Sequence, residues 1–400
     1  MVSNERYIEK LELSNIQISK HCIPGNKTRA NWGKSAWSIS QAVALAFLAL
    51  LALGTIAFLS PVAAAADDGN GAVYTMTNAA AGNEVIRYDR AADGTLIFSG
   101  TFSTNGMGTG SSLGSQGGLV LSEEGDLLLV VNAGSNDTSV FRVKPKGLML
   151  TDKVSSGGIQ PISIAIHEDL VYVLNAGASG NIAGFHLSNK GKLSLIPGST
   201  RPLSGIAVGP AEIAFDPDGK VLVVTEKSSN IIDTYTVDKK GIANGPMTHA
   251  SNGATPFGFA FDKKGHLIVS EAASNALSSY AVDDHGNLVT ISGSIPDFQI
   301  AACWVVVTKN GKFAYTNNAH SGTISSYEIG KTGMISLLDS IAGTPGTGNI
   351  DLALSKNSKF LYSLNFGVST IAGFRVNPDG SLTPVTTVSV PGGANGLAAR

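Results

Sequence analysis

The sequence predicts an all-β protein folded as a seven-bladed β-propeller, with four antiparallel strands per blade and the first blade closed by the C-terminal strand. Two observations carry this prediction. A motif recurs seven times with a period of about 45 residues, and no stretch after residue 66 keeps a helical apolar period. Glycine fills 47 of 400 positions while charged residues make up 14%, which is typical of neither a disordered chain nor a long coiled coil.

The recurring motif is an aromatic residue followed six positions later by glycine. An apolar residue stands two positions after each glycine, and a small polar residue closes an apolar run nine or ten positions before each aromatic. Glycine accepts positive φ without a Cβ clash, so each of these positions predicts a tight turn. The seven pairs are Tyr88 and Gly94, Phe141 and Gly147, Phe185 and Gly191, Tyr235 and Gly241, Tyr280 and Gly286, Tyr327 and Gly333, and Phe374 and Gly380.

Each unit contains four short apolar runs. In the unit around Phe185 we expect strands at 162–166, 170–174 and 181–187, and a fourth beginning at 193–197. Pairs such as Asp218-Gly219 in other units join the first strand to the second. Four antiparallel strands repeated seven times predict a propeller.

The two ends of the repeat region predict how the ring closes. The first unit opens directly with a second-strand pattern at 72–78, so its innermost strand is missing. The C-terminus supplies a spare inner strand at 395–399. We expect this strand to pair beside 73–78, which removes open strand edges that would otherwise promote aggregation.

The N-terminal part has a different character. Residues 1–41 form a positively charged leader, 42–66 an export signal or membrane anchor, and 67–400 the propeller. Residues 42–59 are apolar apart from Gly54 and Thr55, and small residues at 62–66 suit signal peptidase. The sequence predicts export to the periplasm or cell exterior; the alternative is an uncleaved anchor, which touches the membrane through 42–59 alone.

Composition also bounds the partners. The formal net charge is −2, without the basic surplus that binding to nucleic acid requires. Acidic stretches at 216–219 and 283–287 fall where hairpin turns are needed, and Asx turns explain them without calcium. We expect a monomer with no metal and no cofactor.

Three segments carry a resemblance to a known family: FDPDGKVLVV at 215–224, NAGSNDTSVF at 132–141 and NPDGSL at 377–382. With the repeat over 71–400, the chain resembles the seven-bladed lactonase-type propellers. These include the propeller type of 6-phosphogluconolactonase and the carboxymuconate cyclases, and they are similar to the YVTN-repeat propellers. The resemblance implies lactone opening, with a histidine near the start of an inner strand. The seven matching slots hold no histidine: Gly117, Ile162, Ala211, Phe257, Cys303, Ile350 and Asn395.

Ligands of propellers usually meet the mouth of the central channel. Glu212 and Asp351 each interrupt an apolar inner strand there, and either could serve as acid or base or only hydrogen-bond loop amides. His320, in a neighbouring loop, is either an assisting group or an ordinary turn residue. Trp304 could stack a ring or fill the core. The residues expected to bind a ligand are Gln116, Gln160, Ser163, Glu226, Glu271, Trp304, Asn349 and Asn395.

Two functions therefore stay open. One is an exported enzyme that opens a sugar or small organic lactone, with Glu212, Asp351 and His320 as its catalytic groups. The other is a non-catalytic propeller that binds a small molecule, a glycan or a protein partner at the same mouth. The missing histidine favours binding, and the family resemblance favours the enzyme.

Overall fold

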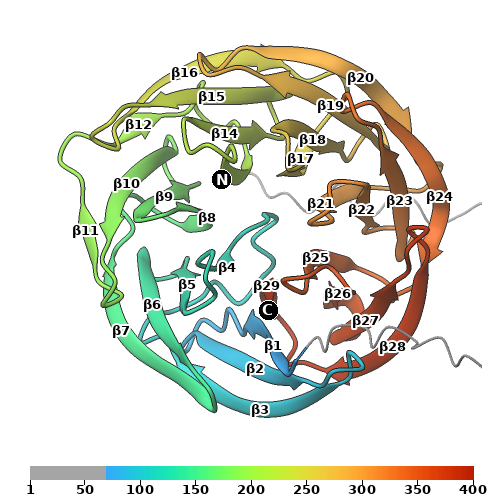
Figure 1. Cartoon of the computed structure of the whole chain (residues 1–400). Coiled ribbons are helices and arrows are strands. Elements are labelled where there is room, and N and C mark those ends of the chain that lie inside the picture. Colours follow the sequence, from blue (N-terminus) through green and yellow to red (C-terminus); the bar gives the residue numbers. More distant parts are fainter. Residues whose placement is uncertain (1–68) are drawn as a thin grey trace, which may run out of the picture. The chain divides into compact units, whose positions relative to one another are not determined.

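The structure, a computed structural model, describes residues 69–400, and these form a ring of seven antiparallel sheets around an axis (Figure 1). The predicted seven-bladed propeller is confirmed. The predicted leader 1–41 and the export segment 42–66 lie outside the described residues. Within residues 69–400, no helix is long and apolar enough to span a bilayer.

Each blade places one strand next to the axis and three further outward. The innermost strands are β29 (Asn395–Ala399), β4 (Leu119–Leu121), β8 (Pro161–His167), β13 (Pro210–Phe215), β17 (Pro256–Phe261), β21 (Ala302–Val307) and β25 (Asn349–Leu354). The second strands are β1 (Gly71–Met76), β5 (Leu127–Asn132), β9 (Leu170–Asn175), β14 (Val221–Glu226), β18 (His266–Glu271), β22 (Phe313–Asn318) and β26 (Phe360–Asn365).

The outer half of each blade follows the same order. The third strands are β2 (Glu84–Arg90), β6 (Asp137–Lys144), β10 (Asn181–Leu187), β15 (Ile231–Val237), β19 (Ala276–Val282), β23 (Thr323–Ile329) and β27 (Thr370–Val376). The outermost strands are β3 (Leu96–Ser103), β7 (Gly147–Ser155), β11 (Leu193–Leu195) with β12 (Arg201–Pro202), β16 (Ala243–Ala250), β20 (Leu288–Pro296), β24 (Ile335–Gly343) and β28 (Leu382–Ser389). One short 3₁₀ helix, η1 (Phe366–Val368), is the helical element of residues 69–400.

The blade around Phe185 departs from the expected pattern in its outermost strand. The predicted strand over 193–197 ends at Leu195, and β12 resumes the pairing with β10 at Arg201. Pro197 and Gly198 lie in the gap, where proline cannot donate to the ladder and Gly198 has a positive φ of 75°.

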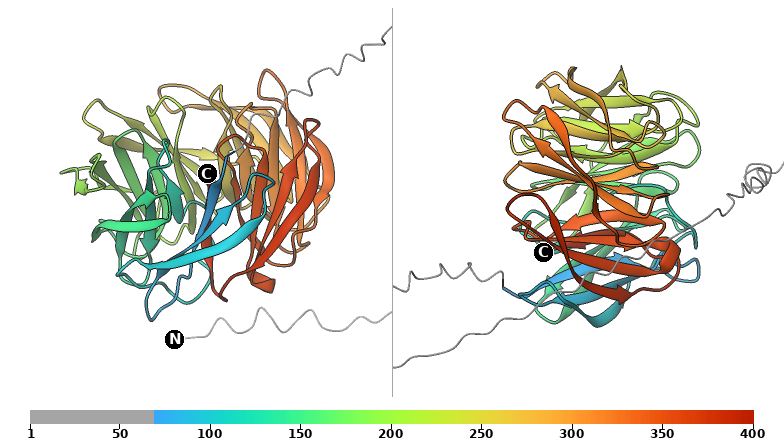
Figure 2. Two further views of the ribbon diagram at one scale, coloured as in Figure 1. Left: turned by 60° about the horizontal axis from the view of Figure 1, so that its bottom comes forward. Right: turned by 90° about the vertical axis from the view of Figure 1, so that its right-hand side faces the viewer.

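Ring closure follows the sequence prediction. β29 pairs antiparallel with β1, with Val73 opposite Ala399 and Thr75 opposite Leu397. The two strands lie side by side in each view, although they come from opposite ends of the described chain (Figure 1, Figure 2). The first blade therefore has the strand order β29-β1-β2-β3.

The repeat motif holds neighbouring blades together. Its seven aromatic residues are buried, with exposed fractions of 3% or less. In five of the seven blades the glycine packs on the second strand of the preceding blade: a Cβ on Gly94 would lie 2.4 Å from the Phe360 ring. A tyrosine hydroxyl of that second strand donates to the glycine carbonyl, as Tyr172 does to Gly241 at 2.8 Å and Tyr315 to Gly380 at 2.9 Å. At Gly94, Gly241 and Gly380 glycine is required both for positive φ and for close approach, whereas Gly147 begins β7 without a positive φ.

Candidate functional site at the channel

Six of the seven innermost strands share a shift of register in their pairing with the second strand. The pairing of β13 with β14 shifts register between Pro210 and Glu212, and that of β25 with β26 shifts between Ile350 and Leu352. Such a bulge leaves a backbone N–H without a partner in its own ladder. The residue at or directly beside the shift is Ser163, Glu212, Gly258, Trp304, Asp351 or Gly396 in β8, β13, β17, β21, β25 and β29, whereas β4 pairs with β5 without a shift.

Polar side chains at this position bridge one blade to the next. The Ser163 hydroxyl accepts the Ile213 N–H at 3.1 Å, and Glu212 Oε2 accepts the Phe259 N–H at 2.6 Å. Asp351 accepts two N–H groups, from Leu352 at 2.9 Å and from Leu397 in β29 at 3.1 Å. These contacts satisfy the backbone groups that the bulges release. Glu212 and Asp351 thus each have a structural role, which is to join neighbouring blades.

Glu212 and Asp351 stand three blades apart around the axis, in β13 and β25. They are 6% and 3% exposed. Burial raises the pKa of Glu212 well above its ordinary value, and the negative charge of Asp351 raises it further, against the Phe259 N–H that lowers it. Burial likewise raises the pKa of Asp351 to about 8, against the lowering effect of its two N–H donors. Near neutral pH the Asp351 carboxyl therefore favours the protonated form, and burial shifts the pKa of Glu212 in the same direction.

The segment 106–118, which precedes β4, extends toward the centre of the ring (Figure 1). Gln116 exchanges two hydrogen bonds with the Val305 backbone, its Nε2 donating at 2.8 Å and its Oε1 accepting at 3.0 Å. Its own N–H donates to the Ala211 carbonyl at 3.1 Å. In β17 the bulge residue is Gly258, where a Cβ would lie 2.2 Å from Gln116 Oε1. Gly258 has no side chain that could bridge β17 to β21. The Gln116 side chain, which comes from a loop, accepts the Val305 N–H in its place.

Trp304 is mainly a packing residue. It is 4% exposed, its ring lies 4.8 Å from that of Phe257, and its Nε1 donates to the Ser115 carbonyl at 3.0 Å. The indole thus anchors the segment 106–118 on the opposite side of the channel from β4, and a bound ring could stack on it only if that segment moved.

Lys227 was not predicted from the sequence, and it lies in the same cluster. Its ammonium stands 4.9 Å from the centre of the Phe257 ring and donates to the Gly114 carbonyl. Burial lowers the pKa of Lys227 to about 8, and the nearby Cys303 thiol, whose own pKa burial raises to about 12, partly opposes this. One feature of the sequence distinguishes Lys227 from other lysines: it directly follows Glu226, at the end of a second strand. Lysine pairs such as Lys239-Lys240 and Lys263-Lys264 instead occupy hairpin turns.

Glu226 and Glu271, predicted to bind a ligand, lie inside their own blades at the ends of β14 and β18, and both are fully buried. Glu226 accepts from the Ser204 N–H at 3.0 Å and from the Ser229 hydroxyl at 2.7 Å. Glu271 accepts from the hydroxyls of Ser278 and Ser294. Asparagine ends the second strand in four of the other blades, as Asn132, Asn175, Asn318 and Asn365. The structure does not bring these two glutamates to the channel.

The other predicted ligand-binding residues are dispersed. Asn349 is fully buried and donates to Asn317 Oδ1 at 3.1 Å and to the Thr323 carbonyl at 2.8 Å. Asn395 accepts the Leu113 N–H at 3.0 Å. Gln160 is exposed and takes part through its backbone. His320, proposed as a catalytic group, is exposed in the turn after β22, where its N–H donates to the Ile300 carbonyl at 3.3 Å.

The arrangement at the channel is thus two buried carboxyls on inner strands three blades apart. Lys227, whose pKa burial lowers, lies separately against Phe257 and the segment 106–118. Among residues 69–400, no group of three or more His, Cys, Asp or Glu side chains could hold a metal ion. This combination suits proton transfer to and from a bound substrate.

The comparisons with known proteins bear on the same region. The sequence model of the family described as "Lactonase, 7-bladed beta-propeller" matches residues 183–303 and 299–396. These matches span 183–396, which is 214 of the 400 residues. The chain belongs to this family. The family resemblance drawn from the repeat is confirmed.

Relatives within the family are distant. A 6-phosphogluconolactonase of Yersinia pseudotuberculosis is 24% identical over 176 residues, or 41% of this chain. The chain spans about half, 52%, of the length of that relative.

Solved structures match over more of the chain. The periplasmic gluconolactonase of Pseudomonas aeruginosa has a TM-score of 0.66 at 16% identity, covering 82% of this chain and 99% of that one. A protein from Lactobacillus plantarum has a TM-score of 0.69 at 18% identity, covering 83% and 99%. At such identities the likeness shows the fold alone.

Proposed function

We propose that this lactonase-type propeller hydrolyses a sugar or small organic lactone at the mouth of its channel. The observation that carries the proposal is the pair Glu212 and Asp351, two carboxyls on inner strands three blades apart whose pKa values burial raises. Membership of the lactonase family and the gluconolactonase among the structural neighbours support the substrate class.

The two carboxyls suit complementary roles in lactone opening. The Asp351 carboxylate accepts a proton from water as the water oxygen attacks the lactone carbonyl carbon. The tetrahedral intermediate then expels the ring oxygen, which takes the proton of the Glu212 carboxyl, and the product is an open hydroxy acid. Ionised Asp351 keeps Glu212 protonated through charge repulsion, so the two groups can hold opposite protonation states.

Substrate entry requires the segment 106–118 to shift, because its contacts with Val305, Trp304 and Lys227 cover the mouth. Six glycines lie within 106–118, including Gly108 and Gly114, so the segment has the backbone freedom to move. His320 stands outside this cluster, in the exposed turn after β22.

The experiment is a lactone panel followed with a pH indicator, using the full chain. We expect turnover that Glu212→Gln and Asp351→Asn each reduce at least about 100-fold. Glutamine still accepts the Phe259 N–H, so the fold is preserved. The matched control is Asp297→Asn, a buried carboxyl after the outer strand β20 whose pKa burial raises to about 6. It should keep activity, whereas equal losses in all three variants would point to a folding defect.

A second function, ligand binding without catalysis, is favoured by one observation. Glu212 and Asp351 are already engaged with backbone N–H groups, and Gln116 closes the mouth. Absence of turnover in the panel, together with saturable binding of a glycan or small molecule, would establish it.

Export is the remaining part of the proposal. It rests on the apolar residues 42–59 and the small residues after them. Cell fractionation with N-terminal sequencing tests it: a mature chain beginning near residue 67 outside the cytoplasm supports cleavage. An intact chain in the membrane fraction would support the anchor instead.

A further inference from the structure

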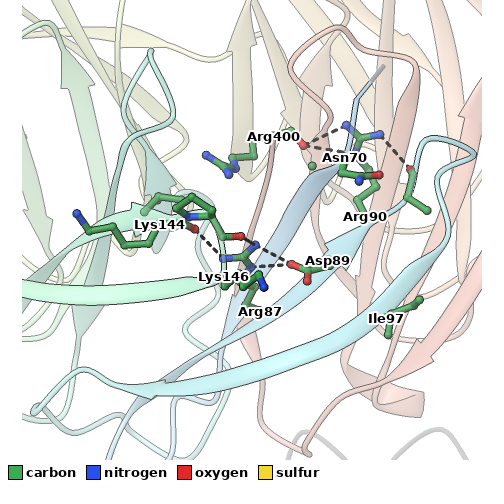
Figure 3. Close-up of a pocket in the computed structure, with 12 residues that line it drawn as sticks. Asn70, Arg87, Asp89, Arg90, Ile97, Lys144, Lys146 and Arg400 are labelled. Carbon is green, nitrogen blue, oxygen red and sulfur yellow. Dashed lines mark hydrogen bonds and ion pairs between the residues drawn. The ribbon is translucent and has the colours of Figure 1, made fainter. Parts of the chain in front are cut away.

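A cavity of about 740 Å³ opens beside the first blade, and Figure 3 shows the residues that line it. It lies where β2 and β6 end, at the opposite ends of these strands from the segment 106–118. Five cationic side chains line the cavity: Arg87, Arg90, Lys144, Lys146 and Arg400. Asp89 is the one carboxylate side chain among the lining residues that the structure describes. The sequence gives no hint of this cluster, since its members are up to about 310 residues apart.

Arg87 organises one wall of the cavity. It is 3% exposed, pairs with Asp89 at 2.7 Å, and donates to the carbonyls of Lys144 at 2.9 Å and Pro145 at 2.7 Å. Figure 3 shows its guanidinium between Asp89 and the turn that carries Lys144 and Lys146. The Arg87 guanidinium is therefore already paired inside the protein, and its hydrogen bonds hold the turn in place.

Lys144 and Lys146 differ from Arg87 because both are exposed, and the structure gives neither ammonium a partner among residues 69–400. The Arg400 guanidinium, across the cavity, contacts the Gly125 carbonyl at 3.2 Å, which leaves most of its donors available. Three cations without a neutralising carboxylate thus surround one space. Ile97, 68% exposed, adds an apolar wall.

A second cavity of about 420 Å³ continues from the first. It shares Arg90 and Arg400 with it and adds Lys309 and Lys356, both exposed. Lys356 has one weak ion pair, with Glu124 at 3.9 Å. Positive charge therefore runs from the Lys144–Lys146 turn through Arg400 to Lys309.

We infer that these joined cavities bind a small ligand carrying two or more phosphoryl groups. One group would lie between Lys144 and Lys146, and another between Arg400 and Lys309. A phosphoryl group carries about −1.5 to −2 charges at pH 7, so two of them match the four cations that remain available. The cavity volumes lie in the range of small-molecule sites, and Ile97 offers an apolar contact for the organic part of such a ligand. This site is independent of the lactone site.

Isothermal titration calorimetry of the full chain tests this, with orthophosphate, tripolyphosphate and a bisphosphorylated sugar as probes. We expect tripolyphosphate and the bisphosphate to bind at least about tenfold more tightly than orthophosphate, and binding to weaken steeply as salt rises. The double variant Lys144→Gln/Lys146→Gln should weaken both by about tenfold or more. Arg400→Gln should weaken them as well.

The matched control is Lys190→Gln/Lys192→Gln, which removes two exposed lysines from the equivalent turn of the next blade. It should change affinity by less than about twofold, and all variants should keep the wild-type Tm and lactone turnover. No binding of either polyphosphorylated probe would overturn the inference. So would equal weakening by the two double variants, because that pattern indicates non-specific attraction to surface charge.

Discussion

The hydroxyl of Tyr362 donates a hydrogen bond of 2.8 Å to the carbonyl of Gly94, 268 residues earlier in the chain. It joins β26 of the last blade to the turn between β2 and β3 of the first. The same contact recurs from Tyr172 to Gly241 and from Tyr315 to Gly380. The junction where the ring closes therefore has the same chemistry as junctions between blades that are consecutive in sequence.

Gly94→Ala should be strongly destabilising, because Gly94 has a φ of 94° and a Cβ there would lie 2.4 Å from the Phe360 ring. We expect a loss of about 2–4 kcal/mol in the free energy of unfolding, measured by denaturant titration. Gly82→Ala is the control, since a Cβ at Gly82 meets nothing within 4 Å. It should change stability by less than about 0.5 kcal/mol, and a comparable loss in both variants would contradict the explanation.

Removal of residues 395–400 should prevent formation of a soluble monomer. β1 would lose its partner strand and expose an edge, and Asp351 would lose the Leu397 N–H. Size-exclusion chromatography should show aggregates or a swapped oligomer. A monomeric truncated chain with the wild-type Tm would show that β29 is dispensable.

Asp351→Asn should stabilise the protein at alkaline pH. The folded pKa of Asp351 is about 8, above an unfolded value of about 4, so its contribution is complete below pH 4 and is lost as pH rises through 8. Asparagine avoids this loss and tolerates the positive φ of 60° at this position. At pH 9 the variant should exceed wild type by at least about 1 kcal/mol in unfolding free energy, with the gain disappearing toward pH 4.

The control for that experiment is Asp379→Asn. Hydrogen bonds from Ser381 lower the pKa of Asp379, which is exposed. Its carboxylate is favoured in the folded protein, so the substitution should give no gain in stability at pH 9.

A reciprocal pair of substitutions tests the acidic pair in the fourth blade. Asp233 of β15 is fully buried beside Glu226, and burial together with that neighbour raises the pKa of Asp233 to about 8. Ser278 takes the same place in the next blade and donates to Glu271. Asp233→Ser should therefore raise stability at pH 9 by about 1–2 kcal/mol, and Ser278→Asp should lower it by about 2 kcal/mol. Thermal unfolding at pH 5 and pH 9 measures both, and a change of the same sign in the two variants would refute the comparison.

The pH dependence of lactone turnover tests the assigned base. If the Asp351 carboxylate accepts the proton of water, kcat/KM should rise with pH and level off above about 8. Asp351→Asn should abolish that rise, while Asp379→Asn should leave the profile unchanged. A wild-type profile that is flat between pH 6 and pH 9 would remove Asp351 from this role.

The architecture could be predicted from the sequence because the repeat is local. Each aromatic residue and its glycine lie within one hairpin, and the same pattern appears seven times, so strand order and ring closure followed from short-range features. The broken outer strand at Pro197 and Gly198 was missed, although both residues are poor strand formers.

The channel was predicted less completely. Glu212 and Asp351 were found because a carboxylate in an apolar strand is conspicuous. Their action on a substrate stays a prediction, and the structure adds that each bridges two blades. The role of Gln116 depends on Val305, 189 residues away, and on the missing side chain of Gly258. Contacts of this kind depend on the assembled ring, as do the position of Lys227 and the cavity around Arg87, so no local pattern indicates them.

The pairing of β29 with β1 places the first and last strands of the propeller in adjacent positions of one sheet. A short peptide could therefore join them, and the chain could be opened instead at a connection between two other blades. Such a circular permutant would retain every strand pair while moving the seam to a different blade. The location of the seam is thus a property of chain order and is not imposed by the geometry of the ring.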